Sequence, residues 1–304
     1  MIPTPSTVHR SGRIALAGAP NVGKSTLLNS LVGVHLSIIT ERPQTTRRNI
    51  IGILNGPDFQ AVLVDTPGLL DPAYRLQDVM RRHAIQAIGG ADVLVLLVDA
   101  VTVTRTGADP DEATADALRI SSGHQPVVLA LNKVDRVRKP LLLPLIAHYH
   151  GTGAFRAVVP ISARQGEGLD GLVREACALL PPGPPVYPSD VLTEHPEHFF
   201  VAEFVREAIF ARYRQEIPYG VATQVEEFRR GRGKTFLRVL VWVEQERHRP
   251  ILLGRQGRGI RAVGIAARRT IEELLGEPVY LELLVKVRPG WRERDDYLQE
   301  LGLL

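Results

Sequence analysis

The chain has 304 residues, of which 44% are hydrophobic and 23% charged, which is a globular composition for about two domains of roughly 150 residues. The first 13 residues hold no apolar stretch of signal-peptide length, and the longest strongly apolar run, at 93–101, is too short to cross a bilayer, so neither export nor membrane spanning is expected. The single cysteine, Cys177, excludes an internal disulfide and is typical of a reducing compartment, so we expect a cytoplasmic protein.

The net charge of +4 is unevenly distributed along the chain. Residues 1–198 carry 18 basic and 18 acidic side chains, whereas residues 199–304 carry 19 and 15. Between Arg247 and Ile271 there are seven arginines and no acidic residue. The chain prefers arginine to lysine, 32 to 5, which explains the number of arginines but not the absence of acids. We therefore expect an acidic partner for the last third of the chain.

The first 180 residues alternate apolar strands with amphipathic segments of helix length. Two strands, at 49–54 and 59–65, flank the turn-rich sequence NGPD and are predicted to form a hairpin. The remaining alternation predicts an α/β domain with a mostly parallel sheet covered by helices on both faces. Strands are expected at 13–18, 49–54, 59–65, 92–100, 126–132 and 157–162, and helices include 74–88, 111–121 and 168–180.

A proline-rich segment separates this half from the next. Residues 181–190 contain five prolines in ten positions, a density that disfavours both helix and sheet. We predict a first domain at 1–180, a linker at 181–196 and a second domain at 197–304. The second domain is a smaller α+β domain with a short tail, and its elements are expected as helix 197–213, strands 221–229 and 235–244, short helix and loop 249–257, helix 258–275 and strand 278–287.

The sequence after the first strand predicts a phosphate-binding loop. It reads GAPNVGKST, fits the pattern G-x-x-x-x-G-K-[ST], and lies between a predicted strand and a predicted helix. Glycines allow successive amides to face phosphate oxygens, and the helix amino terminus adds positive charge. Lys24 is expected to reach the β- and γ-phosphates and the Ser25 hydroxyl to ligate Mg²⁺. The nucleotide-binding residues expected in this loop are Gly18, Ala19, Pro20, Asn21, Val22, Gly23, Lys24, Ser25 and Thr26.

A second motif, DTPGL, follows a strand at the same predicted sheet edge. Asp65 ends the strand, where its carboxylate is suited to hold Mg²⁺, and the Gly68 amide is suited to meet a γ-phosphate. On its own, the sequence DTPG would be interpreted as a turn. Here it follows the phosphate loop after one hairpin, and this position favours a functional role. The expected nucleotide-binding residues here are Asp65, Thr66, Pro67, Gly68 and Leu69.

A third motif predicts which base is bound. A strand ends in Asn132-Lys133-x-Asp135, and this aspartate can accept two hydrogen bonds from guanine, a donor pair that adenine lacks. After the next strand, the backbone at Ser162 and Ala163 is expected to meet guanine O6. The motifs occur in order and each follows a strand, so we predict that the nucleotide is GTP or GDP.

A second glycine loop lies in the acid-free basic region. Gly254-Arg255-Gln256-Gly257 joins two predicted helices, and the later helix has apolar residues spaced by three and four. A GxxG turn between helices resembles the KH domain, in which this turn clamps the backbone of single-stranded nucleic acid, and the element order resembles type II. The alternative is an ordinary turn with solvated arginines. The expected RNA-binding residues are Gly254, Arg255, Gln256, Gly257, Arg258, Arg261 and Arg268.

The chain as a whole resembles the Era family, among the translation-factor-like GTPases. Beyond the motifs above, the resemblance rests on RPQTTRRNIIGI, ISARQGEG and the segments around the linker and the second glycine loop, and it extends from about residue 12 to the tail. It implies a GTPase that binds the 3′ end of small-subunit ribosomal RNA and assists assembly of the 30S subunit. We expect a monomer, and peripheral contact with the inner face of the cell membrane is left open.

The resemblance also implies a mobile switch after the first helix. Thr46 is the first choice for closing onto Mg²⁺ and the γ-phosphate, and Thr45 is the second. Leu69 stands where Ras-like enzymes have a glutamine that orients water, so slow intrinsic hydrolysis is expected. Asn21 in the loop is found in GTPases that use K⁺ in place of an arginine finger. The candidate catalytic residues are Lys24, Thr46, Gly68 and Asn21, the candidate Mg²⁺ ligands are Ser25, Thr46 and Asp65, and nucleotide state is expected to alter 36–48 and 66–80.

Two other functions are weighed against this one. A ribosome-associated GTPase with tandem GTPase domains also carries a KH-like module, but only one phosphate loop occurs here. A constitutive RNA-binding protein with a purely structural GTPase domain is the other, and the complete set of nucleotide motifs counts against it. Cys177 and Trp242 are interpreted as core residues, and Trp291 as a tail anchor that could lie close to RNA.

Overall fold

The computed structural model describes residues 8–40, 42–107, 111–121 and 125–304, and it divides into two compact units. The first unit contains the chain up to Ser37, then Thr46–Asp71 and Met80–Glu194. The second contains His195–Leu304 together with two short segments from the first half, Ile38–Thr45 and Pro72–Val79. Residue 41, within the predicted switch, lies outside the described residues. The two short segments both fall in the predicted switch regions, so those regions are divided between the units.

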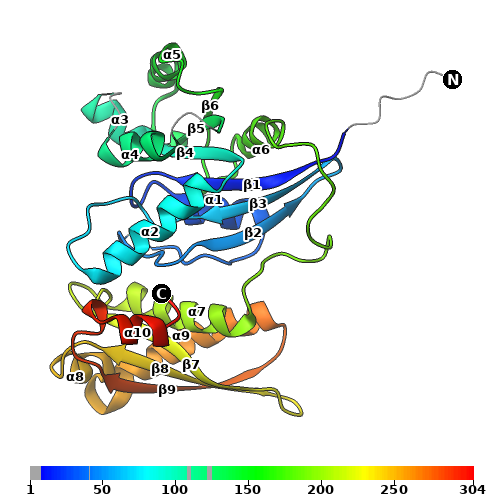
Figure 1. Ribbon diagram of the computed structural model, residues 1–304. Helices are drawn as coiled ribbons and strands as arrows, with labels where there is room; N and C mark the ends of the chain where they lie inside the picture. Colours follow the sequence, from blue (N-terminus) through cyan, green and yellow to red (C-terminus); the bar gives the residue numbers. More distant parts are fainter. Residues whose placement is uncertain (1–7, 41, 108–110, 122–124) are drawn as a thin grey trace. The chain divides into compact units, whose positions relative to one another are not determined.

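The first unit is built on a six-stranded sheet in the order β2-β3-β1-β4-β5-β6 (Figure 1). β2 and β3 form the predicted antiparallel hairpin, and every other neighbouring pair is parallel. The predicted α/β domain with a mostly parallel sheet is therefore confirmed. The strands are β1 (Arg10–Ala17), β2 (Ile50–Asn55), β3 (Phe59–Asp65), β4 (Val93–Asp99), β5 (Val127–Asn132) and β6 (Ala157–Pro160).

Helices cover both faces of this sheet. The strands β1, β4 and β5 contribute buried residues to a core cluster shared with α2, α3, α4 and α5, among them Ala15 and Ala17. Their neighbours Ile14 and Leu16 are also buried and point to the opposite face, because successive side chains alternate along a strand. The helices are α1 (Lys24–Val32), α2 (Arg75–Gly89), α3 (Ala100–Thr106), α4 (Glu112–Ser121), α5 (Leu142–Gly151) and α6 (Leu169–Cys177).

The proline-rich segment lies along the first unit. The buried side chain of Gln60 accepts hydrogen bonds from the amides of Val186 and Tyr187, at 2.7 and 2.8 Å, and donates to the Tyr187 carbonyl at 2.8 Å. Farther on, the Ile53 amide donates to the carbonyl of Leu192 at 2.8 Å. Several backbone polar groups of the segment are therefore satisfied by β2 and β3, and a turn at 189–190 is closed by a hydrogen bond from the Val191 amide to the Pro188 carbonyl at 3.1 Å.

The second unit has a three-stranded sheet in the order β7-β8-β9. β7 and β8 are antiparallel, whereas β8 and β9 are parallel and are joined by a crossover through α8 and α9. The element order is the predicted α-β-β-α-α-β, and the α+β KH-type fold is confirmed. Its elements are α7 (Glu197–Arg212), β7 (Val221–Arg229), β8 (Thr235–Val243), α8 (His248–Leu253), α9 (Arg258–Leu275) and β9 (Val279–Val287), followed by α10 (Asp295–Glu300).

A buried tryptophan anchors the tail of the second unit. Trp291 is fully buried, and its indole Nε1 donates to the Gly220 carbonyl at 3.0 Å. The interpretation of Trp291 as a tail anchor is confirmed, and its proximity to RNA stays a prediction that this burial does not test. Cys177 and Trp242 are buried as predicted. Within the described residues, no helix has both the length and the apolar character needed to cross a membrane.

Candidate functional site

The phosphate loop joins β1 to α1 and depends on glycine where the chain turns. Gly23 precedes α1 with φ of +106°, in the left-handed region. A Cβ at this position would lie 2.3 Å from the side-chain nitrogen of Asn132, so a larger residue would displace the Asn132 amide or the loop. The turn between β1 and α1 consists of Gly18, Ala19, Pro20, Asn21, Val22 and Gly23, and Lys24, Ser25 and Thr26 follow it as the first residues of α1 at the carboxyl edge of the sheet.

Lys24 is folded back over this turn. Its side chain is buried, and Nζ donates to the carbonyls of Gly18 and Ala19, each at 3.0 Å. Burial lowers the pKa of Lys24 to about 8, an effect that the carboxylates of Asp65 and Asp111 partly oppose. Anionic phosphate oxygens beside Nζ would favour the charged form of this amine, as expected of a phosphate-binding lysine.

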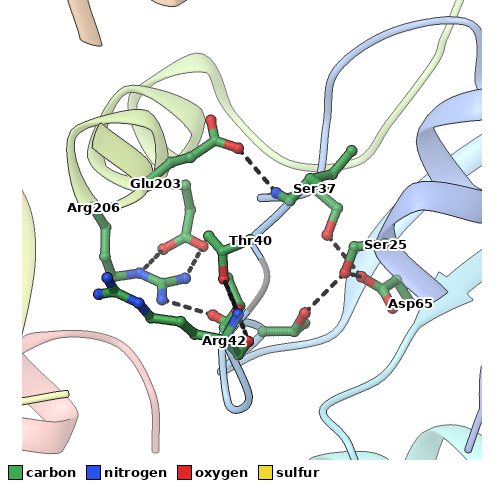
Figure 2. A network of polar contacts seen from close by, with 11 residues as sticks. Ser25, Ser37, Thr40, Arg42, Asp65, Glu203 and Arg206 are labelled. Atoms are coloured by element: carbon green, nitrogen blue, oxygen red, sulfur yellow. Dashed lines mark hydrogen bonds and ion pairs between the residues drawn. The ribbon is translucent and has the colours of Figure 1, made fainter. Parts of the chain in front are cut away.

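Oxygen atoms from three elements meet at the end of β3. The Ser25 hydroxyl donates to Asp65 Oδ2 at 2.7 Å and lies 3.1 Å from the Thr46 hydroxyl, and the Ser37 hydroxyl also donates to Oδ2 at 2.7 Å (Figure 2). Burial raises the pKa of Asp65, against the opposing effects of Lys24 and of hydrogen bonds from Ser25, Ser37 and Thr46. Ser37 was missed by sequence reasoning, because a serine in a loop carries no spacing signal.

This oxygen cluster fits Mg²⁺. The other carboxylate oxygen, Asp65 Oδ1, is buried and has no hydrogen-bond partner among the described residues. Mg²⁺ prefers oxygen ligands and is commonly held by one or two protein groups together with substrate phosphates. No group of three or more His, Cys, Asp or Glu side chains suited to a metal occurs in the described part of the chain. Ser25, Thr46 and Asp65 are the groups that could hold the ion, together with phosphate oxygens of a bound nucleotide.

The two candidate threonines have different surroundings. Thr46 faces Ser25, as described above, whereas the Thr45 hydroxyl donates to the Arg42 carbonyl and contacts the Thr40 hydroxyl, each at 2.8 Å. Thr45 is thus engaged within its own loop. This arrangement favours Thr46 over Thr45 as the candidate ligand.

The predicted base-reading residues converge behind the phosphate loop. Asn132 donates to the Val22 carbonyl at 2.7 Å and accepts from the Ala163 amide at 2.9 Å, so it joins three motifs. Asp135 lies in a single turn after β5, and its exposed carboxylate forms no hydrogen bond or ion pair with the described residues. Ser162 is fully buried beside Ala163. Asn132 thus links the strand end to neighbouring motifs, whereas the carboxylate of Asp135 is exposed, and the roles of both residues in binding guanine stay predictions.

Lys133 has a partner that sequence reasoning did not name. Its Nζ donates to Asp99 Oδ2 at 2.6 Å and to the Asn21 carbonyl at 2.8 Å. Asp99 ends β4 and caps α3 through the Val101 amide. An aspartate at the end of an apolar strand was the available signal, and it was the same signal that identified Asp65.

The DTPGL segment lies close to the phosphate loop. A Cβ on Gly68 would approach Pro20 to 3.0 Å, and the Thr66 hydroxyl donates to the Leu16 carbonyl at 2.8 Å. Leu69 is buried in the core cluster of the sheet. The residue after the motif glycine therefore supplies packing and has no polar group to orient water.

The second glycine loop connects α8 to α9 in the second unit. Gly254 has φ of +70°, and a Cβ there would lie 2.8 Å from the Gly259 amide nitrogen, so the two helix ends approach closely. Gln256 also has a positive φ, +51°, and its side chain is exposed. Arg255, Arg258 and Arg261 are exposed and form no ion pair with the described residues, whereas Arg268 lies 3.8 Å from Glu272.

A groove of about 270 Å³ runs beside this loop between α9 and β9. Its apolar members include Ile265 and Tyr280, both 59% exposed, and Arg261 and Arg268 also line it. The Tyr280 ring is stacked on Phe236 at 5.6 Å between centroids. Exposed apolar and aromatic groups next to exposed arginines are suited to single-stranded nucleic acid, in which bases stack and phosphates need positive charge. Sequence reasoning did not resolve this groove, since its walls come from two separate elements.

Family models match both units. A model described as "50S ribosome-binding GTPase" matches residues 13–133, and one described as "KH domain" matches residues 216–292. GTPase Era from Geotalea daltonii is 43% identical over 96% of this chain and 97% of its own length. The chain belongs to the Era family of GTPases. The resemblance noted from the motifs is thereby confirmed, and so is the expectation of GTP hydrolysis.

Other Era proteins are similar over nearly the whole chain. A chloroplastic ERA-like GTPase from rice is 40% identical over 97% of this chain and 69% of its own length. A crystal structure of Era in complex with MgGDPNP and nucleotides 1506–1542 of 16S ribosomal RNA has a TM-score of 0.91 and 35% identity, and covers 97% of this chain and 99% of its own. Era from Aquifex aeolicus bound to GDP and aluminium fluoride matches with the same TM-score and identity.

Proposed function

We propose that this protein is a GTP-driven switch that binds the 3′ region of small-subunit ribosomal RNA in the cytoplasm and assists assembly of the 30S subunit. The observation that carries the proposal is the 35% identity, over 97% of the chain, to an Era structure containing both MgGDPNP and a 16S ribosomal RNA segment. Support comes from the chain itself, which has a phosphate loop in one unit and exposed arginines beside an apolar groove in the other. No second function is favoured by a specific feature.

The nucleotide is held by backbone amides and a few side chains. The turn from Gly18 to Ser25 surrounds the phosphates, and Lys24 neutralises charge on the β- and γ-phosphates. Asp135 accepts the two guanine hydrogen bonds, while Asn132 keeps its strand end attached to the phosphate loop. When bound, Mg²⁺ would stabilise the negative charge on the transferred phosphoryl group. Ser25, Thr46 and Asp65 are the residues that would hold it.

Hydrolysis is expected to be slow without a partner. The Leu69 side chain is buried and cannot hydrogen-bond to water, so a Ras-type orienting group is missing at that position. Backbone amides, including that of Gly68, remain to meet the γ-phosphate. Slow GTP hydrolysis is suited to a switch that stays in its GTP-bound state during an assembly step, whereas an enzyme that serves to convert substrate needs a fast reaction.

We also propose that K⁺ supplies charge stabilisation near Asn21, whose side chain is exposed at the phosphate loop with φ of +62°. Single-turnover GTP hydrolysis is expected to be about tenfold faster in KCl than in NaCl, since a missing charge-stabilising contact costs at least this much in such reactions. The measurement compares the two salts at equal ionic strength. Equal rates would eliminate K⁺ from the mechanism.

The switch proposal is tested by RNA affinity in different nucleotide states. A 3′-terminal fragment of small-subunit ribosomal RNA is titrated with protein in the presence of GDP, of a non-hydrolysable GTP analogue and of no nucleotide. We expect the dissociation constants to differ by about tenfold between the GDP and analogue forms, a coupling of ordinary size for two linked sites. Three equal constants would refute the switch, and absence of RNA binding in all three states would refute the RNA assignment.

A further inference from the structure

A buried arginine in α7 holds the loop that precedes Thr46. Arg206 is 2% exposed, and its Nε donates to Glu203 Oε1 at 3.0 Å while Nη2 forms an ion pair with the other carboxylate oxygen. Its Nη1 donates to the main-chain carbonyl of Thr45 at 2.6 Å. Figure 2 shows the Arg206 guanidinium between Glu203 and this loop. All three residues belong to the second unit.

The Thr45 carbonyl that Arg206 binds belongs to the peptide group that joins Thr45 to Thr46. Because a peptide group is planar, holding the Thr45 oxygen restricts the direction in which the chain enters Thr46. The Thr45 side chain is itself buried. The same loop is held at its other end, where the Ile39 amide donates to Glu207 Oε1 at 2.9 Å. Two polar side chains of α7 therefore hold the backbone at Ile39 and at Thr45.

Filling the space inside the second unit does not by itself explain why position 206 is an arginine. Burying a guanidinium is costly unless it is paired, and an apolar residue of similar volume would often pack at least as well. What a buried, hydrogen-bonded arginine adds is a single preferred geometry at its acceptor, in this case a loop carbonyl next to a candidate Mg²⁺ ligand. The contact thus specifies the path of the loop.

We propose that Arg206 is a positioning residue for GTP hydrolysis, acting through the Thr45–Thr46 peptide to place the Thr46 hydroxyl beside Ser25 and Asp65. The inference rests on the assignment of Thr46 in the proposed function. It places one determinant of the GTPase reaction on α7, which packs against α9, the helix that follows the second glycine loop.

The first test replaces Arg206 by methionine in the full-length protein. Arg206→Met is expected to slow single-turnover GTP hydrolysis by about ten- to a hundredfold, because a misplacement of about 1 Å costs up to that much. It should also raise the Mg²⁺ concentration needed to retain a non-hydrolysable GTP analogue. Affinities for GDP and for the RNA fragment should not change. Arg206→Lys, which keeps a donor for the Thr45 carbonyl but lacks the fork for Glu203, should restore part of the rate.

The matched control is Arg212→Met, on an exposed arginine of the same helix, which should leave the hydrolysis rate unchanged. If Arg206→Met lowers the melting temperature, the pair Glu203→Gln with Arg206→Met removes the uncompensated carboxylate and undergoes the same measurements. A normal rate and normal Mg²⁺ dependence in a folded Arg206 variant would overturn the inference. So would equal losses of GDP and RNA binding, which indicate a general structural defect.

A double-variant cycle with Thr46→Ala tests whether Arg206 acts through Thr46. The readout is the Mg²⁺ midpoint for retaining the GTP analogue. We expect the double variant to match Thr46→Ala alone, whereas independent effects would multiply and overturn the inference. If Thr46→Ala itself shifts nothing, the assignment of Thr46 fails and the inference fails with it. If Thr46→Ala shifts the midpoint and Arg206→Met does not, the proposed function survives and only the role of Arg206 is refuted.

Discussion

Replacement of Asp135 by asparagine is expected to change the protein from a guanosine nucleotide binder to a xanthosine nucleotide binder. GDP affinity should fall by about a thousandfold, because a site built to hydrogen-bond a ligand strongly rejects one that no longer matches. Xanthine has a carbonyl in place of the exocyclic amine of guanine, so the new amide can donate to it. Competition with a fluorescent nucleotide would measure both affinities in the same protein.

The exposed position of Asp135 means that its substitution tests base recognition separately from stability. Asp135 is exposed and unpaired among the described residues, so its replacement should leave the melting temperature unchanged. Asn132 offers no comparable experiment, because both ends of its amide are engaged with neighbouring motifs. Asp170→Asn, an exposed aspartate in the first turn of α6, is the control and should keep the guanine preference. An unchanged ratio of GDP to XDP affinity in Asp135→Asn would show that another group reads the base.

The second large effect is expected from Arg255→Asp combined with Gln256→Asp. These exposed side chains lie in the second glycine loop, and two carboxylates there would repel a phosphate chain. RNA affinity should fall by about a hundredfold or more at moderate salt. The plot of log affinity against log salt should become shallower by about 0.7 for each phosphate that the protein no longer neutralises. Affinity for GDP should be unaffected, because its residues lie in the first unit.

A control with the same change in charge separates local contact from overall repulsion. Arg269→Asp with Gln299→Asp alters an arginine and a glutamine that are also exposed in the second unit but lie outside the loop. This variant should weaken RNA binding several-fold at most. A reduction equal to that of the loop variant would contradict a specific role for the glycine loop and leave only the net charge of the domain.

The sequence predicted the two folds well because each carries strong local signals. Strand β7 and helix α9 have the predicted bounds, and the boundaries of β1 and β4 differ by a few residues. Helix α6 ends at Cys177 rather than at 180, and Pro181 follows this end closely, where the residue before a proline avoids helical geometry. The hydrophobic periodicity within each element, and the glycines and prolines at the element ends, account for the agreement between predicted and observed boundaries.

The sequence was less informative about residues that act through partners distant in the chain. Ser37 has no spacing pattern that distinguishes it from an ordinary polar residue, Asp99 has only its position at the end of an apolar strand, and Arg206 has no such pattern either. Each becomes notable only through its contacts, with Asp65, Lys133 and the Thr45 carbonyl respectively. The groove between α9 and β9 could not be predicted from the sequence either, because the periodicity of one element does not show which of its side chains face a second element.

By itself, the sequence determined the order of elements, the phosphate loop, the guanine-reading motif and the basic glycine loop, because each depends on residues close together in the chain. Tertiary structure alone decided that Thr46 rather than Thr45 faces Ser25, and that α7 holds the Thr45 carbonyl. The physical reason is that hydrogen bonds and burial depend on distances in space. A buried ion pair such as Glu203–Arg206 acquires its third partner only when a loop 161 residues away in the sequence folds against it.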